Sequence, residues 1–201
     1  MAQNAFHELK NIWTRKSKIG EQKRIQLYEA LVLPILMYNC GTWGLTKQNL
    51  ESLNVMHRKQ LRSIIGIHWP EKISNTDLYE RCQVKPISYK VKEQRWKLLG
   101  HILRREDEIP AQTAMTEYFK RGPKYQGRTP TSLPTILNQD LKRYTAYLKT
   151  TPGELLSTSQ KTTTVPTQLA SGRDMAALRS LAQDRDTWRE LTRHMHEPDR
   201  D

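Results

Sequence analysis

Apolar residues recur at helical spacing along most of this chain, and this period constrains its fold more than any other feature. The first example is Ala5, Leu9, Ile12 and Trp13, and the same spacing returns over residues 50–65 and again near the C-terminus. A repeat of about 3.6 residues lines up side chains on one face of an α-helix, whereas a half-buried strand alternates with a period of two. No convincing alternation occurs anywhere. The sequence therefore predicts an all-α fold: a helical bundle, a basic helical module and a loosely attached C-terminal helix.

Proline, glycine and capping residues divide this pattern into individual helices. Residues 21–39 are apolar on every side, which predicts a buried central helix that Pro34 bends. Ser74 fits the N-cap of a short helix, with Asp77 in the position of the usual Glu. The remaining helices are expected over residues 88–105, 111–120, 133–148 and 174–196. Residues 150–172 are poor in large apolar groups and predict a flexible linker.

The charge of the chain is strongly positive and unevenly distributed. It carries 33 Lys and Arg against 21 Asp and Glu, a net charge of +12. Residues 1–128 hold 23 of these basic and 12 of the acidic residues, so +11 of the charge lies there and only +1 in residues 129–201. A basic chain most often meets an anionic polymer, nucleic acid first and an acidic membrane face second.

Several classes of protein are excluded by the same composition. The longest apolar run, over residues 30–38, is far short of the roughly 18 residues that a membrane helix requires. The first thirty residues carry charges where a signal peptide would need an apolar stretch. Cys40 and Cys82 are too few for a disulfide framework or a zinc knuckle. We therefore expect a protein of the nucleus or cytoplasm that does not bind membranes, and no metal or other cofactor.

The helix expected over residues 88–105 separates its apolar and basic residues. Its cations (Lys90, Lys97, His101 and Arg104) lie nearly opposite its apolar face on a helical wheel. A solvated surface helix could show the same pattern. Cations in the preceding helix and in the following loop favour contacts with phosphates instead. The predicted phosphate-binding residues are Arg58, Lys59, Arg62, Lys90, Lys97, His101, Arg104, Arg121, Lys124 and Arg128.

Two neighbouring residues on this helix need separate interpretations. Arg95 falls within the apolar stripe, so it is expected to have a carboxylate or carbonyl partner. Trp96 flanks the same stripe and is the tryptophan we would test for stacking on bases. Trp13 and Trp188 fall on apolar stripes elsewhere and are expected in the core. The short helix, turn and basic helix over residues 74–105 also suggest a helix-turn-helix.

Catalytic signals are missing from this sequence. It contains no adjacent pair of aspartates, which nucleotidyl transfer needs to hold two cations. It also shows no glycine-rich phosphate loop and no nucleophile elbow. The acidic run over residues 106–108 lies at a helix end among arginines and is interpreted as a solvated turn. No catalytic residues are predicted, and the chain is not expected to be an enzyme by itself.

Several segments, taken in order, resemble the region that follows the palm in reverse transcriptases of LINE-type (non-LTR) retrotransposons. They are residues 27–38 (LYEALVLPILMY) with Thr42 and Trp43, residues 58–67 (RKQLRSIIGI) with Trp69, residues 95–105 (RWKLLGHILRR) with Ile109 and Pro110, residues 127–130 (GRTP) with 140–142 (DLK), and residues 181–191 (LAQDRDTWREL). Two departures from the family are the missing acidic residue over residues 39–43 and Thr129, which interrupts the usual Gly-Arg-Pro. The likeness covers nearly the whole chain.

The resemblance implies a thumb-like helical region with a C-terminal extension, which would grip a primer–template duplex and element RNA without performing chemistry. The endonuclease, fingers and catalytic palm would lie upstream, and the palm would be a partner. On this reading residues 1–68 form the thumb-like bundle, 69–128 the basic module and 129–201 the extension. Two alternatives stay open: a helix-turn-helix module that binds DNA, and a structural remnant of a retroelement reading frame that binds nothing.

Overall fold

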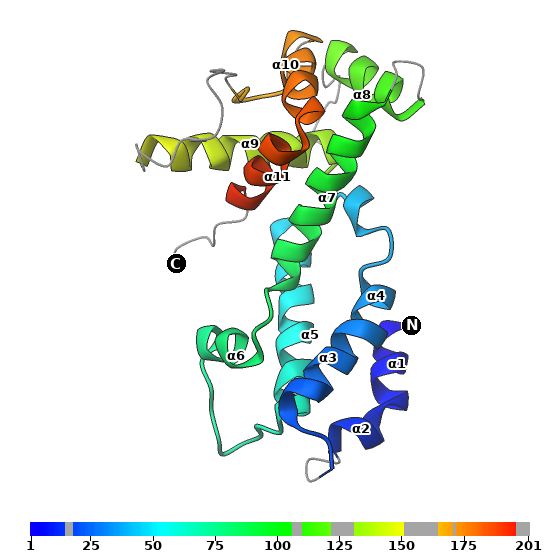
Figure 1. Ribbon diagram of the computed structural model, residues 1–201, viewed down its shortest axis with the longest axis vertical. Coiled ribbons are helices and arrows are strands. Elements are labelled where there is room, and N and C mark those ends of the chain that lie inside the picture. Colours follow the sequence, from blue (N-terminus) through cyan, green and yellow to red (C-terminus); the bar gives the residue numbers. More distant parts are fainter. Residues whose placement is uncertain (15–17, 106–109, 122–130, 151–164, 171, 196–201) are drawn as a thin grey trace. The chain divides into compact units, whose positions relative to one another are not determined.

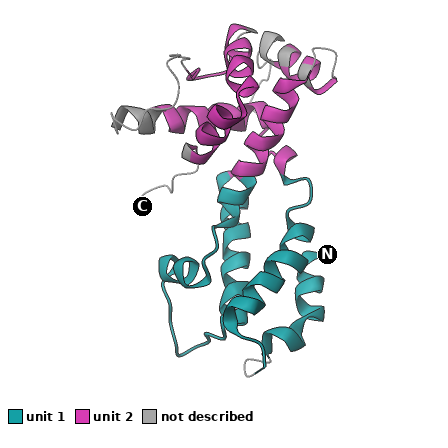
Figure 2. Ribbon diagram, viewed as in Figure 1, with its two compact units in different colours: residues 1–40, 47–91 teal, residues 41–46, 92–201 magenta. Residues whose placement is uncertain are grey.

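The computed structural model describes residues 1–14, 18–105, 110–121, 131–150, 165–170 and 172–195. Within these ranges the regular elements are all helices, and no strand occurs (Figure 1). This confirms the all-α prediction. The chain forms two compact units: residues 1–40 with 47–91, and residues 41–46 with 92–201 (Figure 2). Packing thus divides the chain at other places than the segments 1–68, 69–128 and 129–201, which stay a prediction of functional organisation.

The first unit consists of short helices around one long one. Its helices are α1 (Ala2–Glu8), α2 (Lys10–Thr14), α3 (Glu21–Leu31), α4 (Leu33–Leu36), α5 (Lys47–Ile65), α6 (Asn75–Cys82) and the start of α7 (Ile87–Arg104). Trp13 lies in its core as predicted, and its indole N–H donates to the Phe6 carbonyl at 2.8 Å. Ser74 caps α6 as predicted, because its hydroxyl accepts the backbone N–H of Asp77 at 3.0 Å.

The segment expected as one buried helix over residues 21–39 is instead two helices. α3 ends at Leu31 and α4 begins at Leu33, close to the expected bend, because Pro34 has no N–H to continue the ladder of hydrogen bonds. Leu31 and Ile35 are exposed to 44% and 43%, and Tyr38 to 80%. Burial on every side is therefore wrong for this segment.

The second unit is held by a continuous apolar core. Besides the rest of α7 it contains α8 (Pro110–Arg121), α9 (Leu133–Thr150), α10 (Gly172–Gln183) and α11 (Arg185–His194); the short helix η1 (Cys40–Thr42) begins where the first unit gives way to it. The core side chains include Leu99, Leu137, Leu178, Trp188 and Leu191. The contribution of Trp188 and Leu191 from α11 shows that the final helix is an integral part of this unit, not a loose attachment.

The C-terminal part of the chain corrects two further expectations. The helix predicted over residues 174–196 is broken at Asp184, whose carboxylate accepts the N–H groups of Asp186 and Thr187 and thereby begins α11. Part of the predicted linker is packed: Leu169 is buried, and its backbone N–H and carbonyl bond the side-chain amide of Asn138 at 2.7 and 3.1 Å. Residues 151–164 and 171 of that linker lie outside the described residues.

Candidate nucleic-acid interface

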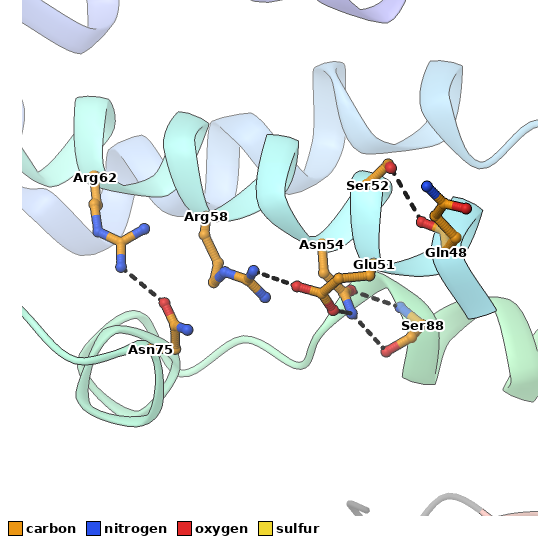
Figure 3. A network of polar contacts seen from close by, with 8 residues as sticks. All are labelled: Gln48, Glu51, Ser52, Asn54, Arg58, Arg62, Asn75 and Ser88. Carbon is orange, nitrogen blue, oxygen red and sulfur yellow. Dashed lines mark hydrogen bonds and ion pairs between the residues drawn. The ribbon is translucent and has the colours of Figure 1, made fainter. Parts of the chain in front are cut away.

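Of the three cations predicted on α5, the two arginines are bonded to protein side chains and the lysine is exposed. Arg58 pairs with Glu51 (Nη2–Oε1, 2.6 Å), and Arg62 donates to Asn75 Oδ1 at 2.9 Å from the next turn of the same face (Figure 3). The hydrogen bond from Arg58 holds the pKa of the Glu51 carboxyl below its usual range. Lys59 is exposed. Among these three cations, Lys59 is the one that a phosphate can reach without displacing a protein partner.

The arginines of α5 belong to a polar network that also fixes the start of α7. The amide of Asn54 donates to the Ser88 hydroxyl at 3.1 Å and accepts the Ser88 backbone N–H at the same distance (Figure 3). Two turns of chain that are 34 residues apart are thereby held together. The first polar side chain of α7 is thus committed to α5.

The cations of α7 are placed in both units. Lys90, in the first unit, is half-buried and pairs with Glu29 at 2.7 Å. In the second unit, Lys97 pairs with Glu93 one turn earlier at 2.8 Å but keeps 56% of its side chain exposed. His101 is exposed, and Arg104 donates to the Ala182 carbonyl at 3.1 Å.

Spacings of four and three residues put Lys97, His101 and Arg104 on one face of α7, as predicted. An exposed ion pair such as that of Lys97 contributes little and exchanges readily. The remaining predicted cations cannot be placed. Arg121 ends α8 with its side chain outside the described residues, and Lys124 and Arg128 lie outside them altogether.

Arg95 confirms one prediction and Trp96 overturns another. The Arg95 guanidinium pairs with Asp140 (Nη1–Oδ2, 2.8 Å), with exposed fractions of 1% and 5%. The indole N–H of Trp96 donates to the same carboxylate at 3.2 Å, and its side chain is fully buried. Trp96 therefore cannot stack on bases. The reason is that Asp140, far along the chain, draws both neighbours inward.

A buried histidine behind the basic residues was not singled out by the sequence. The ring of His57 is fully buried between Tyr28 and Tyr79, with centroid distances of 5.8 Å to each. Neither of its nitrogens has a hydrogen-bond partner among the described residues. Burial, together with the nearby charges of Lys90 and Arg58, lowers the pKa of His57 to about 3. The ring is neutral, so it adds no charge to the surface.

Three other kinds of feature bear on function: metal sites, membrane-spanning helices and reactive thiols. The described residues contain no group of three or more His, Cys, Asp or Glu placed to hold a metal ion. No helix within the same residues is long and apolar enough to cross a membrane. Both cysteines are buried as free thiols, and burial raises the pKa of Cys82 to about 11. The exposed cations described above, Lys59, Lys97 and His101, lie on the helices α5 and α7.

Comparison with known proteins links this helical, basic chain to mobile elements. It is 30% identical over 146 residues to an uncharacterized transposon-derived protein of Caenorhabditis elegans. The match covers 68% of this chain and 50% of the relative, so the chain matches about half the length of that protein. No protein-family model and no solved structure matches the chain. The similarity indicates a transposon-related origin.

Proposed function

We propose that this chain is a nucleic-acid-binding helical fragment of a LINE-type reverse transcriptase. It binds RNA or an RNA–DNA hybrid through phosphates and performs no chemistry by itself. The observation that carries the proposal is the exposed basic face of α7, with Lys97 and His101, together with Lys59 on α5. The net charge of +12 and the similarity to a transposon-derived protein support it. The upstream palm of the parent polymerase is the proposed protein partner.

The helix-turn-helix alternative is less well supported by the geometry. A recognition helix presents the side chains of its first turns to base edges. In α7 these turns hold Ser88, which is bonded to Asn54, and Lys90, which pairs with Glu29. Its first residue, Ile87, is fully buried. We therefore favour contact with the backbone of a duplex, made by the later turns of α7, over reading of a base sequence by the first turns.

Charge reversal at the two exposed lysines tests the proposal. The variant Lys59→Glu with Lys97→Glu changes one cation in each unit and leaves the buried pairs intact. We expect its affinity for a labelled 20-base-pair RNA–DNA hybrid, measured by fluorescence anisotropy at low salt, to fall at least tenfold. The matched control, Lys23→Glu with Lys142→Glu, makes the same charge change at exposed positions outside the predicted faces.

Equal losses in the test and control variants would show that net charge, not these faces, determines binding. No binding by the wild-type chain at low salt would contradict the proposal altogether. Preference for one duplex sequence in a random-site selection would favour the helix-turn-helix alternative. We expect no nucleotide incorporation in a primer-extension assay with Mg²⁺ or Mn²⁺, because no catalytic carboxylate pair is present in the sequence.

A further inference from the structure

Helix α11 carries three arginines at intervals of four residues. Arg185, Arg189 and Arg193 are all exposed. Four residues advance an α-helix by about 6 Å and turn it by only about 40° beyond a full turn, so the three side chains form one stripe. We call these residues the α11 stripe. Residues 129–201 have a net charge of only +1, because nine acidic residues offset their ten basic ones. Three of these acidic residues belong to α11 itself: Asp184 is its N-cap, and Asp186 and Glu190 lie within it.

The opposite face of α11 fixes the direction in which the stripe points. Trp188 and Leu191 are buried in the core of the second unit, and the Trp188 indole N–H donates to the Trp96 carbonyl at 3.1 Å. Gly100 of α7 permits this close approach, because a Cβ at that position would collide with the indole ring of Trp188. Rotation of α11 about its own axis would break this contact, so the arginines stay on the outer side.

The stripe has a neighbour on α7. Arg104 donates to the carbonyl of Ala182, at the end of α10, and lies near enough to Arg185 for the two charges to interact. Burial lowers the pKa of Arg104, and repulsion by Arg185 lowers it further. Arg104 therefore connects the predicted basic face of α7 with the α11 stripe inside the second unit.

This arrangement does not stabilise the fold. Like charges four residues apart on a helix cost a few tenths of a kcal/mol for each pair. Within the stripe, Arg189 has an ion pair, with Asp186 at 2.7 Å, but both side chains are largely exposed (69% and 86%), so this pair contributes little. The repulsion is relieved when the stripe meets an anion with several regularly spaced charges.

We propose that the α11 stripe, with Arg104 beside it, binds successive phosphates of the nucleic acid that the chain binds. This inference rests on the proposed function and adds a second contact surface to it. Guanidinium groups bind phosphate oxygens in a bidentate manner, which suits a repeated backbone better than isolated lysines do. The C-terminal helix then contributes to affinity although it lies in the segment with the lowest net charge.

The test is a triple substitution, Arg185→Gln, Arg189→Gln and Arg193→Gln, in the full chain. Its matched control is Lys142→Gln, Arg143→Gln and Arg173→Gln, three exposed cations on α9 and α10 of the same unit. Binding to the 20-base-pair hybrid is measured by anisotropy at several NaCl concentrations. Circular dichroism melting checks that all variants remain folded. A third variant, with lysine at the three stripe positions, retains the charge.

Each phosphate contact adds about 0.9 to the slope of log affinity against log salt, so loss of three contacts lowers the slope by about 2.7. Between 50 and 200 mM NaCl the wild-type chain should then lose about 40-fold more affinity than the glutamine variant. The control and the lysine variant should retain most of the wild-type slope.

Wild-type binding with an unchanged slope in the glutamine variant would overturn this inference and leave the proposed function standing. A control that loses as much slope as the glutamine variant would also overturn it. Failure of the wild-type chain to bind would contradict both proposals.

Discussion

Acidification should destabilise the first unit through His57. Its ring is fully buried between two tyrosines, and no described residue hydrogen-bonds either nitrogen. Protonation would create a buried cation next to Lys90 and Arg58, both of which already oppose it. His57→Leu removes the titrating group and fills the same space with apolar atoms. An unpaired buried polar group contributes no hydrogen bond, so we expect the substitution to be nearly neutral at pH 7.

The size of this loss of stability follows from the difference between the pKa of His57 in the folded chain and in the unfolded chain. A histidine in the unfolded chain has a pKa of about 6.5, whereas that of His57 in the folded chain is about 3. Between these values the unfolded state binds more protons, so stability rises with pH across the window and is lost as the pH falls through it. From pH 7 to pH 5 the loss amounts to roughly 2 kcal/mol.

Urea unfolding followed by circular dichroism at pH 7 and pH 5 measures this effect. The fall in unfolding free energy between the two values should be about 2 kcal/mol larger for the wild-type chain than for His57→Leu. His68→Gln, at an exposed histidine of the same unit, serves as the control and should behave as the wild type. Equal pH dependence in wild type and His57→Leu would refute the reasoning.

Two further predictions concern the second unit. Asp140→Ala leaves the buried Arg95 charge without its partner and should cost about 3–5 kcal/mol of unfolding free energy in urea, whereas Arg95→Met with Asp140→Leu should recover most of it. A loss below about 1 kcal/mol would contradict the buried pair. Gly100→Ala places a Cβ against the Trp188 ring and should lower the Tm through a loss of about 1–3 kcal/mol, and an unchanged Tm would contradict this close contact.

The helical elements could be predicted from the sequence because local patterns determine them. Amphipathic spacing indicated α5, α7 and α9, and the Ser74 cap follows from a short motif that needs no distant partner. The break between α10 and α11 at Asp184 could also be predicted from the sequence. An aspartate side chain that accepts the N–H groups of the next residues favours a new helix start over a continuous helix. Helical periodicity alone does not reveal this break, because the apolar spacing continues across it.

The contacts between helices could not be predicted in the same way. A wheel shows which face is buried but not which helix covers it, so Trp96 was expected at a surface that Asp140 and Trp188 in fact close. Charge could be counted from the sequence, but the partners of Arg58 and Lys90 depend on Glu51 and Glu29. Exposure of a cation is a property of packing, and packing determines which of the predicted contacts remain available to phosphate.

The salt dependence of binding by the wild-type chain tests the central claim most directly. Affinity for the RNA–DNA hybrid, measured by anisotropy from 50 to 200 mM NaCl, should fall steeply, with a slope of about −4.5 if Lys59, Lys97 and the three arginines of the α11 stripe each contact a phosphate. A slope near zero, or no binding at 50 mM NaCl, would contradict the account, because phosphate contacts release counterions and the affinity must therefore depend on the salt concentration.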